Sequence, residues 1–338
     1  MKFTFTSVGI ALGITTLLLM IMIVLFHFLF TRKSKFLYIF FHSYYYWLII
    51  GAVSFLYFFL ARYNQNIIDF FNKKDLLDSG DIYYKSTTYS KAFLLDLCPA
   101  VAFLLPLSLM IDPTRSIAKI MSPYAIIGSI ITIYSTTLST TPNGNVWNYI
   151  FLGEAPNEMF FMMHFNSLVI AIGVMLTSKN YTRYSFLFNF VFICLYIGYV
   201  KAFVDLKGVL YNTTGVSKFD WYDDVYHNFS EYGIVYQLFP IGFPLIQIIA
   251  YIIAVLISFS LMGIKNWTNK DPEKEMYLDK FWYQKIKYIS KPFYIYDLKL
   301  DIFFLRINMW ISKRLLKKNT INLENKIFKN KEIIKTLK

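Results

Sequence analysis

Cys98 and His164 are the two side chains of this sequence that could act together as a nucleophile and a base. Each lies inside an apolar segment, Cys98 about six residues in, or roughly 9 Å, and His164 about five residues in, or roughly 8 Å. Both segments are expected to enter the membrane from the same side. A thiol attacks as its thiolate, and a neutral imidazole within hydrogen-bond reach can remove its proton. The matched depth therefore predicts a catalytic Cys–His pair.

Three further polar side chains share this region: Asp96, Lys201 and Asn166. Ionisable groups inside a membrane span cost free energy and are candidates for function. Asp96 could orient the imidazole of His164 or form an ion pair with Lys201. The second role is favoured, because Asp96 and Cys98 are two residues apart on a helix and point in different directions. Asn166 lies on the same segment as His164, and we expect all three residues to support the site.

A purely structural interpretation of these residue types stays open. A single cysteine in a membrane helix commonly packs as a small apolar side chain, and Cys194 is interpreted in this way. A histidine near a helix end commonly bonds to a nearby carbonyl. His27 and His42 are expected near the inner ends of their spans and His227 in a loop, and all three are interpreted as structural. The two cysteines and four scattered histidines lack the spacing of metal ligands, so we expect no metal and no cofactor.

Membrane-spanning helices must position these residues. Of the 338 residues, 56% are hydrophobic and 16% are charged, and the mean hydropathy is +0.44; soluble domains carry about 25% charged residues. Apolar runs of about 20 residues are long enough to cross a bilayer. The sequence therefore predicts an all-α, polytopic membrane helix bundle with seven transmembrane helices. These spans are expected near 8–30, 36–60, 92–111, 120–138, 159–177, 184–204 and 233–263.

The short connections between the spans predict the orientation of the bundle. Lys and Arg are concentrated in the connections after the first, third and fifth spans, whereas the connections after the fourth and sixth spans are acidic. Positively charged loops stay in the cytoplasm. The N-terminus is therefore expected outside and the C-terminus in the cytoplasm, as an odd number of spans requires. We expect a multi-pass protein of the plasma membrane.

The chain changes character after residue 264, which separates a transmembrane domain (1–264) from a cytoplasmic tail (265–338). The tail carries most of the formal net charge of +13, and residues 298–318 place apolar and basic side chains on different faces of a helix. Such a helix is expected to lie on the anionic lipids of the inner leaflet. A cytoplasmic protein partner stays open, whereas nucleic-acid binding is the disfavoured explanation of the basic charge.

Two stretches resemble the YwaF-type family of bacterial integral membrane proteins. LLDLCP, which contains Cys98, is similar to the L-x-L-C segment of that family, and APNEMFFMMHFNSLVIAIGVML, which contains His164, resembles its phenylalanine-rich segment with one histidine. The eukaryotic relatives of this family are phospholipid acyltransferases that use a Cys and a His. The resemblance implies that Cys98 accepts the acyl chain and that His164 is its base. The stretch VLYNTTGVSKFDWYDD departs from the family's pattern, so lipid recognition is expected to differ there.

The leading hypothesis is a membrane-embedded phospholipid acyltransferase of the thiol type. A phospholipid would donate an acyl chain to Cys98, and a lysolipid would then take the chain from the thioester. Membrane lipids are the expected substrates. The alternative belongs to a different class, a non-enzymatic membrane subunit or a component of a transporter. In that case Asp96, Lys201 and Asn166 would line a polar path or stabilise helix packing.

Overall fold

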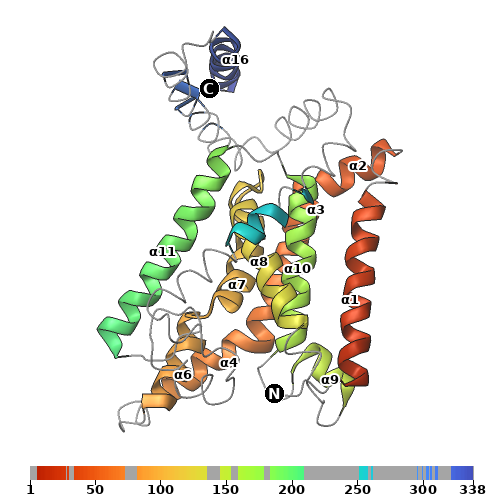
Figure 1. Cartoon of the computed structure of the whole chain (residues 1–338), viewed down its shortest axis with the longest axis vertical. Coiled ribbons are helices and arrows are strands. Elements are labelled where there is room, and N and C mark those ends of the chain that lie inside the picture. The colour runs from red at the N-terminus through yellow and green to blue at the C-terminus, as the bar shows by residue number, and fades with distance from the viewer. Residues whose placement is uncertain are drawn as a thin grey trace. The chain divides into compact units, whose positions relative to one another are not determined.

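The computed structural model describes residues 6–27, 29, 34–72, 82–134, 145–153, 159–178, 183–208, 251–257, 260–261 and 321–337, with single residues and pairs between 295 and 310. The chain divides into two compact units. The first comprises Met1–Ile111 and Arg115–Lys270, and the second comprises Asp112–Thr114 and Asp271–Lys338. All regular structure in the described residues is helical (Figure 1).

The helices of the first unit follow one another along the chain as α1 (Ser7–Phe26), α2 (Lys35–His42), α3 (Tyr44–Phe58), η2 (Phe59–Tyr63), α4 (Asn64–Asn72), α6 (Ile82–Phe93), α7 (Leu97–Ile111), α8 (Ser116–Thr132), α9 (Val146–Phe151), α10 (Phe160–Thr177) and α11 (Arg183–Lys207). The second unit contains α16 (Ile321–Leu337). η2 is a π-helical segment that joins α3 to α4, so that Tyr44–Asn72 is one continuous helical stretch.

Five helical stretches in the described residues are long and apolar enough to cross a membrane. They are Ser7–Phe26, Tyr44–Asn72, Thr88–Ile111, Phe160–Thr177 and Leu187–Lys207. α8 is also apolar but has 17 residues. The expectation of a helical chain with several membrane-length apolar helices is thus confirmed for the described residues. The seventh expected span (233–263), the amphipathic segment 298–318 and His227 lie mostly or wholly outside them.

The observed helices differ most from the expected ones at the second and third expected spans, 36–60 and 92–111. The span expected at 36–60 is divided at Ser43, whose backbone is extended and whose hydroxyl accepts a hydrogen bond from the N–H of Tyr46. The helix that begins there continues past residue 60 to Asn72. Within the span expected at 92–111, the helix is interrupted between Phe93 and Leu97. α8 begins earlier than the expected 120–138, and the last residues of that expected span lie outside the described part of the chain.

α1 has the surface of a helix that faces lipid. Many of its large apolar side chains stay exposed, as Met22 does at 61% of its full accessibility. Its buried residues are the small ones, Gly9, Gly13 and Thr16, and the hydroxyl of Tyr134 donates to the carbonyl of Gly13 over 2.9 Å. In lipid, helices associate through small residues that let their backbones approach. α1 therefore packs through its small residues and through Leu12, Met20, Ile23 and Val24, and leaves its other large side chains to the lipid.

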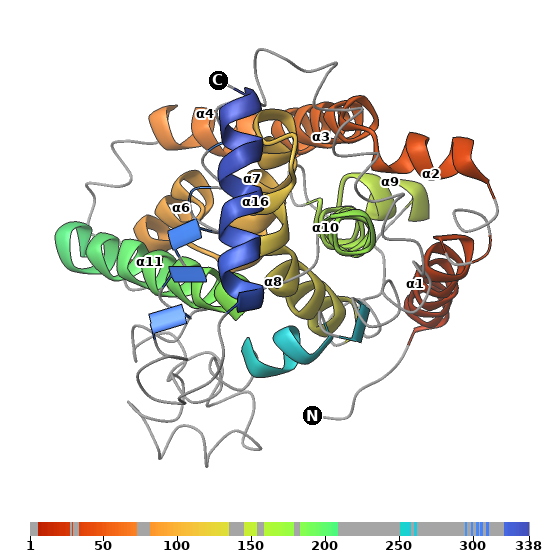
Figure 2. The same ribbon diagram turned by 90° about the horizontal axis from the view of Figure 1, so that it is seen from above.

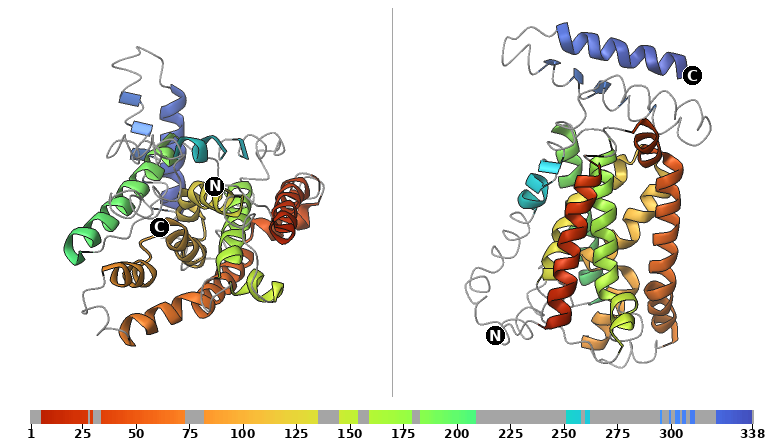
Figure 3. Two further views of the ribbon diagram at one scale, coloured as in Figure 1. Left: turned by 60° about the horizontal axis from the view of Figure 1, so that its bottom comes forward. Right: turned by 90° about the vertical axis from the view of Figure 1, so that its right-hand side faces the viewer.

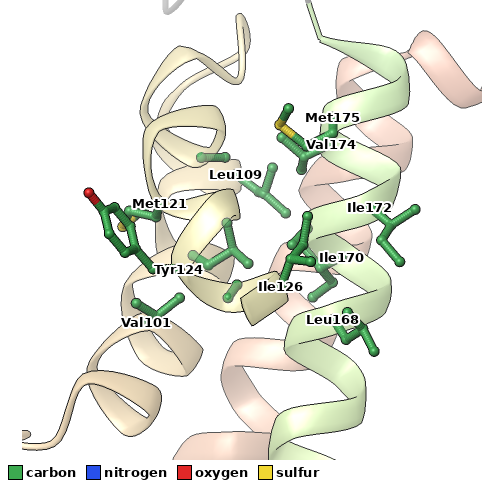
Figure 4. Close-up of a cluster of buried hydrophobic side chains, with 14 of the residues drawn as sticks. Val101, Leu109, Met121, Tyr124, Ile126, Leu168, Ile170, Ile172, Val174 and Met175 are labelled. Atoms are coloured by element: carbon green, nitrogen blue, oxygen red, sulfur yellow. The ribbon is translucent and has the colours of Figure 1, made fainter. Parts of the chain in front are cut away.

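The core of the first unit lies among α3, α7, α8 and α10, which are linked by pairwise contacts (Figures 1 and 3). Viewed from above, α10 lies end-on among α7, α8 and α9 (Figure 2). Leu109, Ile126, Leu168 and Val174 come from three of these helices and are fully buried in one cluster (Figure 4). Because lipid is as apolar as these side chains, close packing rather than the exclusion of water holds the cluster together.

Two glycines let helices of this core approach closely. A Cβ added to Gly51 of α3 would lie 2.7 Å from the carbonyl oxygen of Pro106 in α7. A Cβ added to Gly173 of α10 would lie 2.6 Å from Cη2 of Trp47. The indole N–H of Trp47 donates to the carbonyl of Phe41 over 2.8 Å, so the ring is held in place from a second side. The Trp47 ring thus occupies the surface that Gly173 leaves open.

Arg115 connects three helices at the end of the bundle where α10 stops. Its backbone is left-handed, with φ of 59°, directly before α8. Its guanidinium donates to the carbonyls of His42 at 3.0 Å and Thr177 at 2.7 Å, and lies 6.0 Å from the centre of the Trp47 ring. The last carbonyls of a helix have no partner within that helix. The buried Arg115 side chain therefore caps the ends of α2 and α10 together.

We predict that Gly173→Ala destabilises the bundle by about 1–3 kcal/mol, because the added methyl group overlaps the ring of Trp47. Gly198→Ala in α11 is the matched control, since no described atom lies within 4 Å of a Cβ there. The control should be neutral or stabilising, because alanine favours the helix. Thermal unfolding of both purified variants in detergent measures the difference. Equal stability of the two variants would contradict the close packing of Trp47 on α10.

Candidate functional site

The membrane-length stretch Thr88–Ile111 is interrupted near its start. α6 ends at Phe93, Leu94 adopts the left-handed conformation with φ of 54°, and α7 begins at Leu97. The N–H of Leu95 still bonds to the carbonyl of Ser90 at 3.0 Å. The last carbonyls of α6 are nevertheless released from the helical pattern. In a lipid environment such groups must find donors within the protein.

Three tyrosine hydroxyls supply those donors. Tyr63 of η2 donates to the carbonyl of Ala92 at 2.9 Å. Tyr199 of α11 donates to the carbonyl of Phe93 at 2.6 Å. Tyr196, also of α11, donates to the carbonyl of Leu95 at 2.6 Å and approaches that of Leu94 at 3.3 Å. Side chains from two different helices therefore satisfy the carbonyls that the interruption exposes.

Cys98 lies in the first turn of α7, directly after this interruption. Its thiol lies beside the hydroxyl of Thr132 in α8. A Cβ added to Gly128, one turn earlier in α8, would lie 3.1 Å from Sγ. Cys98 also packs against a buried cluster formed by Phe58, Ala102, Met159 and Met163. The thiol is therefore enclosed by α8 and by side chains from the beginning of α10.

His164 is 4% exposed and lies in the second turn of α10. Its Nδ1 is 2.7 Å from the carbonyl oxygen of Phe160. A carbonyl can only accept a hydrogen bond, so Nδ1 carries the proton and Nε2 of the neutral ring has a lone pair. Nε2 makes no hydrogen bond to any residue that the structure describes. The imidazole is thus fixed through one nitrogen and can accept a proton or a donor through the other.

The expected Cys98–His164 pair is not joined by a hydrogen bond in this structure. The thiol lies beside the hydroxyl of Thr132, and Nδ1 of the imidazole bonds to the carbonyl of Phe160. The two groups nevertheless belong to one neighbourhood, because Cys98 packs against a cluster that includes Met163, the residue before His164. A thiol–imidazole contact would form through Nε2 and would leave the hydrogen bond of Nδ1 to Phe160 in place.

Arg62 brings a positive charge to both groups, and the expectations from sequence did not include it. Its guanidinium acts electrostatically on the Cys98 thiol and on the His164 imidazole. One of its N–H groups donates to Sδ of Met163 over 3.2 Å. Arg62 lies in η2, and a π-helical turn within an α-helix often marks a functional site. The signal that could have revealed it is the apolar pattern that continues past residue 60.

The three supporting residues are placed as follows. Asp96 lies in the interruption and accepts a hydrogen bond from Ser90 at 2.9 Å, and its charge acts on Cys98. Lys201 is exposed and forms its ion pair with Asp205, one turn along α11, in place of the expected pair with Asp96. Asn166 accepts a hydrogen bond from Ser54 of α3 at 3.4 Å. Asp96 is therefore part of the site, Lys201 is exposed and paired on its own helix, and Asn166 links α3 to α10.

His27, His42 and Cys194 lie elsewhere among the described residues. Nδ1 of His42 is 2.8 Å from the carbonyl of Tyr38, and the ring centres of His42 and His27 are 6.0 Å apart. Cys194 is exposed on α11. Among the described residues, no group of three or more His, Cys, Asp or Glu side chains could hold a metal ion. Among the described residues, Arg62, Asp96, Cys98 and His164 bring charged, nucleophilic and basic groups to the site.

We predict that Tyr196→Phe destabilises the protein by about 1–3 kcal/mol, because it leaves the carbonyls of Leu94 and Leu95 without their donor. Tyr46→Phe is the matched control, since the Tyr46 ring is packed against Trp47 while its hydroxyl bonds to no described residue. Thermal unfolding in the same detergent compares the two. If Tyr196→Phe unfolds at the temperature of Tyr46→Phe, the hydroxyl does not support the interruption.

The chain matches the sequence profile of the "Family of unknown function (DUF5378)" over residues 14–296. It is 28% identical over 251 residues to the "Uncharacterized protein MG135" of Mycoplasma genitalium, a match that covers 72% of this chain and 85% of that protein. It is also 28% identical over 186 residues to the "Uncharacterized protein MG135 homolog" of Mycoplasma pneumoniae, covering 53% of this chain and 65% of the homologue. No solved structure matches the chain. The profile matches well over half of the chain, including the interruption, η2 and α10, and the chain therefore belongs to the family DUF5378.

Proposed function

We propose that this chain is a non-enzymatic transport component of the plasma membrane whose substrate site lies at the interruption between α6 and α7. The observation behind this proposal is the interruption itself. It breaks the helix of a membrane-length apolar stretch next to two charged side chains, Arg62 and Asp96. In secondary transporters, substrate sites form where helices are discontinuous, and non-helical backbone is tolerated where protein or a cavity surrounds it.

The proposed orientation places this site in the outer half of the membrane. With seven spans and the N-terminus outside, α3 begins on the cytoplasmic side and α10 begins on the outer side. Arg62 follows Tyr44 by roughly 27 Å of helix, compared with a hydrocarbon core of about 30 Å. His164 lies roughly 6 Å from the beginning of α10. The depths of Arg62 and His164 thus agree, which supports one substrate site open to the outside.

We predict that Cys98 reacts with small, membrane-impermeant methanethiosulfonate reagents added to cells that carry a Cys194→Ser variant. Water must reach a substrate site that is open to the outside, and the thiol lies directly beside the interruption. Arg62→Gln should lower the ratio of the rate for an anionic reagent to the rate for a cationic one by roughly threefold, because a positive charge near the thiol is lost. Rates are measured by counter-labelling with a fluorescent maleimide after denaturation.

Ser108→Cys in a chain that lacks both native cysteines is the control for this labelling. Ser108 lies deeper in α7 and is 2% exposed, so the new thiol should react only after denaturation. A Cys98 that also reacts only after denaturation would mean that the interruption is sealed inside the protein. That outcome would remove the substrate site from this proposal.

Acyl transfer is the second candidate function, and one observation favours it. The thiol of Cys98 and the imidazole of His164 share the neighbourhood of the Arg62 guanidinium. In this reaction His164 removes the thiol proton, and the thiolate of Cys98 attacks the ester carbonyl of a phospholipid. The lysolipid alkoxide leaves with that proton. A second lysolipid hydroxyl then attacks the thioester and restores the thiol. The resemblance to YwaF-type proteins, with its Cys and His, supports the same roles.

If the second function holds, incubation with an alkyne-tagged phospholipid places a hydroxylamine-sensitive acyl group on Cys98. Cys194→Ser should retain the label and Cys98→Ser should lose it, while His164→Asn should slow labelling by about 100-fold or more, since it removes the general base. The label is detected by coupling a fluorophore to the alkyne. Labelling that persists in Cys98→Ser would exclude this mechanism.

A further inference from the structure

The beginning of α10 brings sulfur-containing side chains to the thiol of Cys98. Met159, directly before the helix, and Met163, one turn later, are 1% and 3% exposed and belong to one buried cluster. Cys98 packs against this cluster from α7. Sδ of Met163 already accepts a hydrogen bond from Arg62 at 3.2 Å. The thioether of Met159 and the thiol of Cys98 are therefore two sulfur groups that this region can offer to a ligand.

The imidazole of His164 lies over the same turn of α10. Its Nδ1 is 2.7 Å from the carbonyl oxygen of Phe160, the residue after Met159, and the centres of the His164 and Phe160 rings are 4.9 Å apart. The imidazole is thus folded back toward the beginning of the helix, and the side chain is 4% exposed. Its Nε2 has a lone pair and makes no hydrogen bond to a described residue. A histidine that binds a metal usually donates its other N–H to a carbonyl or carboxylate in this way.

We propose that Cys98, Met159 and His164 bind a soft monovalent metal ion, Cu(I), beside the interruption. This inference rests on the proposed transport function, because it names the class of ion that the substrate site would take. Thiolate and thioether ligands select Cu(I), and imidazole also binds copper, whereas carboxylates and carbonyls suit Mg²⁺ and Ca²⁺. The expectation of no metal from the sequence counted cysteines and histidines alone, and the thioether of Met159 adds a third ligand.

The charge of the ion distinguishes Cu(I) from Zn²⁺ at this site. A free thiol is mostly protonated at neutral pH, and a thiol that coordinates a metal loses its proton. When Cu(I) binds, the S–H bond breaks, a Cu–S bond forms, the proton moves to water, and copper keeps its oxidation state. One positive charge replaces another, so the net charge of the buried site does not change. Zn²⁺ with the same ligands would add one positive charge to that site, which is costly without a compensating anion.

The experiment measures the affinity of the full-length protein for Cu(I) in phosphatidylcholine nanodiscs. Copper is kept as Cu(I) by ascorbate in the absence of oxygen, and the protein competes for it with the coloured chelator bicinchoninate. The parent chain, with Cys194→Ser, keeps only Cys98, whereas a chain with Cys98→Ser keeps only Cys194, which is exposed on α11. We expect the parent chain to bind Cu(I) about 100-fold more tightly, because a single exposed thiol lacks the two other ligands.

Two further variants of the parent chain test the other ligands. His164→Asn and Met159→Leu should each lower the affinity by about tenfold or more, since each removes one ligand. Met175→Leu is the matched control, because Met175 is also buried on α10 but lies roughly 24 Å along the helix from Met159. Its affinity should equal that of the parent chain. X-ray absorption at the copper edge should show sulfur and imidazole ligands in the parent chain, and the imidazole signal should be lost in His164→Asn.

A pH indicator should record the release of about one proton for each Cu(I) bound, and Zn²⁺ should bind more weakly than Cu(I). The inference is overturned if the parent chain binds Cu(I) no more tightly than the chain that keeps only Cys194, if His164→Asn or Met159→Leu leaves the affinity unchanged, or if Zn²⁺ binds as tightly as Cu(I). Labelling of Cys98 from outside the cell does not depend on copper. A chain whose Cys98 is labelled in this way, but which binds Cu(I) only as a single thiol does, keeps the transport site and loses this inference alone.

Discussion

A backbone carbonyl surrounded by lipid has no water to donate a hydrogen bond, and leaving it unsatisfied costs several kcal/mol. The interruption between α6 and α7 creates a run of such carbonyls, from Ala92 to Leu95. Tyr63, Tyr196 and Tyr199 satisfy them. Because these hydroxyls come from η2 and α11, the interruption ties together three stretches that are far apart in the sequence. The position of α11 beside α6 and α7 follows from this requirement.

The same requirement places the polar groups of the site. The turn that brings Tyr63 to the carbonyl of Ala92 is the π-helical segment η2, and it also carries Arg62. The restart of the helix at Leu97 puts Cys98 in the first turn of α7, against Thr132. At the end of the bundle where α10 stops, Arg115 satisfies the carbonyls of His42 and Thr177. At that end Arg115 joins α2 to α10 through two hydrogen bonds. At the interruption, by contrast, Nε2 of His164 has no hydrogen bond to a described residue and can still accept one.

The sequence predicts α1, α10 and α11 well, because long apolar runs bounded by polar residues leave few alternatives in a membrane. It also predicts that Cys98 and His164 lie in one region. It does not predict the interruption, since Leu94, Leu95 and Leu97 favour a helix. The free-energy cost of the exposed carbonyls is offset by hydrogen bonds from tyrosines that are distant in the sequence. Arg62 was missed for a related reason. A charged residue normally ends a span, and here a π-helical turn and nearby side chains accommodate it. The pairing of Lys201 with Asp96 was wrong because Asp205 lies one turn away on the same helix.

Amide hydrogen exchange across residues 88–111, followed by mass spectrometry of the protein in nanodiscs, tests the interruption most directly. The N–H groups of Leu97 and Cys98 open a helix and lack an acceptor one turn earlier, so they should exchange at least tenfold faster than the N–H groups of the interior of α7. Continuous protection from residue 88 to residue 111, as in an unbroken membrane helix, would contradict the interruption and the site built around it.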